Sequence, residues 1–127
     1  MSKHTIKTNQ APAAIGPYSQ AVKAGNFLFV SGQIPLDLAT GTLVIGGIES
    51  ETHRVMKNIE AILTEAGLSF ENVVKTSIFL KSMDDFAHVN TVYASYFSKD
   101  FPARETVEVS RLPKDANVEI SVIASLP

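Results

Sequence analysis

The stretch that decides the fold is FPARETVEVSRLPKDANVE, residues 101–119, near the end of the chain. Residues 104–109 form a strand-like run, in which alternate side chains point to opposite faces of a sheet. Residues 112–115 then predict a turn, because proline fixes φ and aspartate supports tight turns. A second alternating run over residues 118–124 predicts another strand after this turn.

Arg104 and Glu119 are the charged residues that these two strands could bring together. If the second strand returns along the first as in a hairpin, Glu119 comes near Arg104. A guanidinium close to a carboxylate can bind an anion and hold a water molecule or a base beside it. The alternative is a surface salt bridge between neighbouring strands. The pattern alone favours this alternative, because ion pairs are common and functional sites are few.

Length and composition predict one ordinary globular domain, residues 1–127. The formal net charge of -2 gives no electrostatic footprint for nucleic acid or for an anionic membrane. The absence of cysteine excludes disulfides, thiolate metal sites and a cysteine nucleophile. His4, His53 and His88 lack metal-ligand spacing, so no metal site is predicted. Without a signal peptide or a bilayer-length apolar run, a cytoplasmic protein is expected.

The sequence of the first half of the chain predicts two strands, the second of which ends at the candidate site residues Ser31 and Gly32. Residues 21–24 and 27–31 read as two strands around a glycine–asparagine turn. The second strand is apolar on both faces, which predicts a central position in the sheet. Gly32 follows it directly, and a glycine there lets another group approach the backbone closely. Ser31 either delivers a hydroxyl to a pocket or simply ends the strand, and its position alone favours the second interpretation.

Residues 11–20, APAAIGPYSQ, predict a loop because they contain two prolines and a glycine. The loop is apolar and carries few charges, so we expect it to lie against the protein. It presents the hydroxyl of Tyr18 beside a rigid Gly-Pro step. Before it, residues 5–7 predict a short edge strand.

Helical periodicity appears twice in the second half of the chain. Apolar residues at three-and-four spacing predict a helix over residues 48–66, with Gly67 at its C-terminal cap. After a strand over residues 73–80, Ser82 is expected to cap a second helix. Asn90 lies on the buried side of that helix. Its amide either bonds a neighbouring backbone group, which is favoured, or faces a site.

The order strands, helix, strand, helix, strands predicts an α+β fold. Two amphipathic helices can cover one face of a small mixed sheet, which leaves the other face bare. Several residues expected on that bare face are apolar or small. Burial in an oligomer is the simplest remedy, because apolar patches of sheet size are rare on monomers.

Five segments together closely resemble the RidA family of reactive intermediate deaminases, also called the YjgF family. The segments are APAAIGPYSQ, VSGQIP, VVKTSIFL with DDFAHVN, FPARETVEV and SRLPKDANVEI. They cover nearly the whole chain in the family's order and spacing, and PAR followed by RLPKD is the most specific part.

The resemblance implies a chorismate-mutase-like α+β fold and a homotrimer whose sheets form a central barrel with clefts between subunits. It implies hydrolysis of enamine and imine intermediates, such as 2-aminoacrylate and 2-iminobutanoate, to 2-keto acids and ammonia. Pyridoxal-phosphate enzymes release those intermediates, whereas the family itself needs no cofactor. The implied partners are small 2-imino acids and further copies of the chain.

Residue roles follow from the resemblance position by position. Arg104 matches the arginine that holds the substrate carboxylate, a task that suits a planar guanidinium. Glu119 matches the acidic residue that positions the attacking water. The residues that match cleft-lining positions are Tyr18, Ser31 and Asn90, with Gly32 after the serine. Tyr18 or Ser31 could shuttle the tautomeric proton.

Thr106 marks a departure from the family pattern, because many members have a cysteine at this position. A role that needs a thiol is therefore not expected, whereas substrate binding through the backbone at Thr106 is. The alternative function is a non-catalytic regulatory protein that senses a 2-keto acid in the same cleft. A third possible function, action on nucleic acid, is disfavoured by the negative net charge of the chain.

Overall fold

The computed structural model describes residues 3–127, so the first two residues of the predicted domain lie outside the described part. One six-stranded sheet and two α-helices make up the fold. The strands are β1 His4–Ile6, β2 Ala21–Ala24, β3 Phe27–Gln33, β4 Val73–Leu80, β5 Ala103–Glu108 and β6 Val118–Ser125. The helices are α1 Ile48–Glu65 and α2 Phe86–Ala94. Short 3₁₀ turns cover Phe70–Asn72, Met83–Asp85 and Pro113–Asp115.

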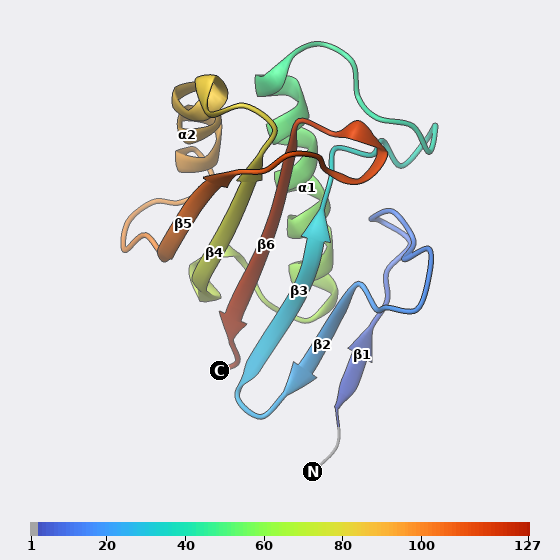
Figure 1. The fold of residues 1–127 in the computed structure, drawn as a ribbon. Helices are drawn as coiled ribbons and strands as arrows, with labels where there is room; N and C mark the ends of the chain where they lie inside the picture. The colour runs from blue at the N-terminus through green and yellow to red at the C-terminus, as the bar shows by residue number, and fades with distance from the viewer. Residues whose placement is uncertain (1–2) are drawn as a thin grey trace.

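The strands lie in the order β1-β2-β3-β6-β4-β5 across one mixed sheet (Figure 1). β4 and β5 are parallel, and every other neighbouring pair is antiparallel. β3 lies between β2 and β6, which agrees with the central position predicted from its apolar faces. The predicted α+β class is therefore confirmed.

The expected hairpin between the last two strands is wrong. β5 and β6 lie on opposite sides of β4, so they share no hydrogen bonds. The reason is α2, which carries the chain from the end of β4 back to its start, so that β5 pairs parallel to β4. β6 then pairs with the other edge of β4. Consequently no salt bridge between Arg104 and Glu119 forms within residues 3–127.

The end of α1 and the turn that leads into α2 are each stabilised by capping hydrogen bonds. After α1, Gly67 adopts a left-handed φ of 78°, and the amides of Gly67 and Leu68 bond the carbonyls of Thr64 and Leu63. Ser82 caps the 3₁₀ turn that leads into α2 by accepting a hydrogen bond from the Asp84 amide. Neither helix has the length and apolar character of a membrane span, within the described residues.

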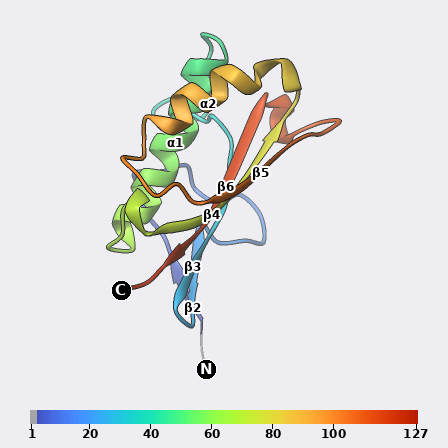
Figure 2. The ribbon, with the colours of Figure 1, turned by 90° about the vertical axis from the view of Figure 1, so that its left-hand side faces the viewer.

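The two helices lie on one side of the sheet (Figure 2). Alternate side chains of β6, such as Val118 and Ile120, are fully buried beneath them. The opposite face, which we call the open face, exposes large apolar side chains. Phe27, Phe29 and Val107 on this face are 42%, 45% and 41% exposed. The predicted helix layer on one face is thus confirmed, and the open face carries apolar surface.

Candidate active site

Four of the predicted site residues line one cavity of about 520 Å³, near the end of β3 and the start of β6. These residues are Tyr18, Ser31, Gly32 and Glu119. They come from the loop before β2, from β3 and from β6, which the sheet order brings together. The antiparallel pairing of β3 and β6 therefore builds this part of the site.

Gly32 allows the carboxylate of Glu119 to lie directly against the backbone of β3. A Cβ atom on Gly32 would lie 2.8 Å from Cδ of Glu119, and still closer to its Oε2. The other six of the chain's seven glycines have a positive φ, whereas Gly32 does not. Glycine is thus required at position 32 by the close approach of Glu119 and not by backbone conformation.

The Glu119 carboxylate is half-buried and has no hydrogen-bond or ion-pair partner among residues 3–127. Burial raises the pKa of Glu119 above its ordinary value of 4.5, because a carboxylate loses solvation there. A carboxylate with a raised pKa is a stronger base than one in water. A group of this kind suits proton transfer from water.

We expect a Gly32→Ala variant to lose at least about tenfold in activity while it keeps its fold, because the added methyl displaces only the flexible end of Glu119. Gly25→Ala is the matched control. Position 25 has nothing within 4 Å of an added Cβ but has a φ of 60°, so alanine there should lower stability and leave activity intact. Steady-state kinetics and thermal unfolding of both variants measure the contrast. Full activity in Gly32→Ala would contradict the role of the close approach.

The loop of residues 11–20, which precedes β2 and forms one wall of the cavity, is held by side chains that hydrogen-bond to the backbone. Ser31 Oγ donates to the carbonyl of Ser19 at 2.6 Å, which ties the loop to β3. Gln20 is buried, accepts a hydrogen bond from the Thr8 amide, and donates to the carbonyls of Thr8, Ala11 and Pro12. These bonds hold the two ends of the loop against the protein. The middle of the loop departs from the prediction, because Ile15 is 79% exposed and Tyr18 is 56% exposed. Sequence reasoning missed Gln20, although a polar residue that ends an apolar loop was a usable signal.

The other three predicted site residues belong to a second group, on the helix side of the sheet. Arg104 on β5 places its guanidinium carbon 5.7 Å from the ring centre of Phe86 and 5.1 Å from that of Tyr93. Asn90 lies between these two aromatic residues on the same face of α2, and its side chain makes no hydrogen bond within residues 3–127. Thr106 follows Arg104 on the same face of β5, and its buried Oγ1 also lacks a partner within the described residues.

The two groups do not meet within one chain. Arg104 pairs with Thr76 of β4, and Glu119 pairs with Phe79 on the other side of that strand. Their Cα atoms are therefore roughly 10 Å apart across the sheet and roughly 10 Å apart along it. Their side chains also point to opposite faces, because Arg104 lies against α2 and Glu119 alternates with the buried Val118.

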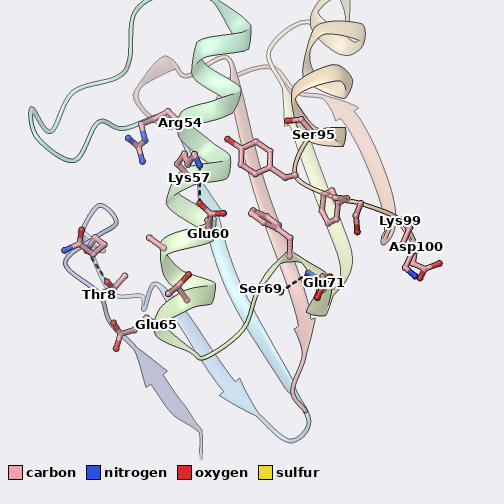
Figure 3. Close-up of a pocket in the computed structure, with 17 residues that line it drawn as sticks. Thr8, Arg54, Lys57, Glu60, Glu65, Ser69, Glu71, Ser95, Lys99 and Asp100 are labelled. Carbon is pink, nitrogen blue, oxygen red and sulfur yellow. Dashed lines mark hydrogen bonds and ion pairs between the residues drawn. The ribbon is translucent and has the colours of Figure 1, made fainter.

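A larger hollow of about 1080 Å³ lies on the helix side of the molecule and contains none of the predicted site residues (Figure 3). Within the described residues, one ion pair forms among the charged side chains that line it. Lys57 pairs with Glu60 at 3.3 Å and lies 5.5 Å from the ring centre of Tyr96. The smaller cavity is the better candidate for chemistry, because four of the predicted site residues line it.

Lys114 is a further cavity residue that sequence reasoning missed as a site residue, because it was interpreted only as part of a turn. It lines the same cavity as Glu119. No group of three or more His, Cys, Asp or Glu residues within the described chain could hold a metal ion. The cavity therefore offers one base, one cation and two hydroxyls as its chemical groups.

A family model described as Endoribonuclease L-PSP matches residues 8–126. The chain belongs to this family, that of the Rid, YjgF and RutC proteins, which confirms the resemblance in its sequence. A RutC family protein of Pyrococcus abyssi is 56% identical over 124 residues, which cover 98% of each chain.

Solved structures agree with this membership. YyfA of Yersinia pestis, described as a member of the conserved Rid protein family, has a TM-score of 0.96 and 51% identity, covering 98% of this chain and 100% of that one. The structure of E. coli TdcF with bound serine has a TM-score of 0.93 and 38% identity, covering 98% of this chain and 99% of that one.

Proposed function

We propose that this protein hydrolyses reactive 2-imino acids and their enamine tautomers to 2-keto acids and ammonia, as a 2-iminobutanoate/2-iminopropanoate deaminase. The observation that carries the proposal is Glu119, an unpaired and half-buried carboxylate in a cavity that Gly32 opens to it. Such a group can activate one water molecule. The resemblance to the RidA family supports the substrate class, and the serine bound to TdcF is a ligand with the same α-carboxylate.

We further propose that the active site forms between two copies in a homotrimer. Arg104 lies on β5, which is an edge strand, so a neighbouring copy can approach it. The apolar open face needs covering, and a second copy would cover it. The cavity of one copy, with Glu119, then faces Arg104 and Asn90 of the next. The number three comes from the family resemblance.

The chemistry follows from these positions. The enamine first tautomerises to the imine, and water then adds to the carbon of the C=N bond. Arg104 neutralises the substrate carboxylate through two parallel hydrogen bonds. Glu119 accepts a proton from the water and passes a proton to the leaving ammonia. Ser31 already donates its hydroxyl proton to Ser19, so Tyr18 is the better donor for the tautomeric step.

The direct test is a coupled assay in which threonine dehydratase generates 2-iminobutanoate in the presence of semicarbazide. An active protein should lower the yield of semicarbazone and raise the rate of keto acid release. Absence of any effect at a protein concentration that binds 2-oxobutanoate would instead support the alternative, a metabolite-binding regulatory protein.

Mixing two inactive variants tests the shared site. Arg104→Ala chains keep Glu119, and Glu119→Gln chains keep Arg104, so a mixed trimer can contain a complete site at one interface. If equal amounts are unfolded and refolded together, roughly a quarter of the clefts should be intact, since each residue is supplied independently by one of two neighbours. Activity should recover to about that fraction. No recovery, or a stable monomer by light scattering, would contradict the shared site.

A further inference from the structure

The turn before β6 holds Lys114 in a strained backbone conformation. Lys114 has φ 56° and ψ 21°, and Asp115 has φ 58°, so two successive non-glycine residues are left-handed. Such conformations persist only where the surroundings enforce them. Here Arg111 holds the Asp115 carboxylate with two hydrogen bonds, of 2.6 Å and 3.3 Å. Together with the hydrogen bonds from the amides of Asp115 and Ala116 to the carbonyls of Leu112 and Pro113, this contact holds the backbone of the turn that carries Lys114.

Lys114 is also an unpaired cation at the cavity. Lys114 and Glu119 are the only charged residues that line it among the described residues. Neither forms an ion pair with a residue between 3 and 127. No hydrogen bond joins the Lys114 ammonium to the Glu119 carboxylate either. The charge of Lys114 is therefore available to a ligand.

We propose that Lys114 binds a second anionic group of the substrate, so that the site also takes 2-imino acids with an acidic side chain, such as 2-iminoglutarate. This inference rests on the proposed function, in which Arg104 of a neighbouring copy holds the α-carboxylate. The cavity lining also includes the apolar residues Ala13, Ala14 and Ile34, which suits the methylene stem of such a side chain. The lysine ammonium is a point charge on a flexible stem, so it can form an ion pair with a terminal carboxylate.

Kinetics with Lys114→Met test the inference. An amino-acid oxidase converts glutamate or 2-aminobutanoate with oxygen to the imino acid and hydrogen peroxide, which supplies both substrates in situ. We expect kcat/KM for 2-iminoglutarate to fall at least about tenfold, because a charge-assisted bond is lost, while that for 2-iminobutanoate stays within about twofold. Lys99→Met, which removes the same charge outside the cavity, should change neither value.

Binding of stable keto acids gives a readout that needs no catalysis. Calorimetry should show that Lys114→Met weakens 2-oxoglutarate binding by about the same factor and leaves 2-oxobutanoate unchanged. If no imine is hydrolysed but 2-oxoglutarate binding depends on Lys114, the proposed deaminase activity fails and the inference stands. If Lys114→Met affects both ligands equally or neither, the inference is overturned.

Discussion

An Arg104→Ala variant is expected to lose all detectable hydrolysis of 2-imino acids while it stays folded and assembled. The guanidinium is half-buried against Phe86 and Tyr93 and has no carboxylate partner within residues 3–127, so its charge is free to bind a substrate. A charge-assisted hydrogen bond contributes roughly 1.5–3 kcal/mol, so binding alone should weaken by at least about tenfold. Loss of orientation of the reacting carbon then lowers kcat further.

Arg104→Lys is the matched control for this experiment. Lysine keeps the charge but loses the two-pronged geometry and the flat stacking on the aromatic rings, so it should recover only part of the activity. Light scattering and circular dichroism establish that both variants assemble and fold. Near wild-type turnover in folded Arg104→Ala protein would remove Arg104 from the mechanism.

A Glu119→Gln variant should show a large fall in kcat with a small change in KM. The amide has nearly the same shape but cannot take a proton from water, so the lost step lies in the chemistry. Thr106→Cys is the companion variant and should keep its activity, because no step of the proposed mechanism uses that side chain. The two variants are compared with 2-iminobutanoate generated in situ. If Glu119→Gln keeps kcat within a few-fold of the parent, Glu119 only orients the substrate.

The raised pKa of Glu119 predicts two further effects, one on the pH dependence of activity and one on stability. Because the reaction needs the carboxylate, wild-type activity should fall as the pH drops through that raised pKa, above the ordinary value of 4.5. The stability of the fold is expected to change with pH in the opposite direction to the activity. A carboxyl whose folded pKa is raised stabilises the fold fully at low pH, and this contribution is lost as the pH rises through the folded pKa. Glu119→Gln removes that loss, so at neutral pH it should unfold at a higher temperature than the parent.

The main elements of the fold were accessible from sequence because their signals are local. The three-and-four spacing of α1, the β-branched run of β4 and the glycine after α1 each predict an element that the structure contains. The pairing of β5 was not predicted correctly, because a turn between two strands suggests a hairpin. The deciding feature was the helix between β4 and β5, which makes that pair parallel and separates β5 from β6.

The sequence names individual candidate site residues but does not predict how they are arranged. Tyr18, Ser31, Gly32 and Glu119 share one cavity, whereas Arg104 lies on the other face of the sheet. Alternation along a strand assigns each side chain to a face but does not identify which faces of different strands coincide. The glycine at the end of a buried strand predicted that some group would lie close to the backbone at position 32. It did not identify that group as the Glu119 carboxylate.

Gln20 fixes the cavity wall through main-chain atoms alone. Its hydrogen bonds end on the amide of Thr8 and on the carbonyls of Thr8, Ala11 and Pro12. The side chains of residues 13–15, which also line the cavity, take no part in those bonds. The wall is thus modular: a library that randomises residues 13–15 and keeps Gln20 can search for new ligands without disturbing the loop. Directed evolution favours such a separation of scaffold from recognition surface.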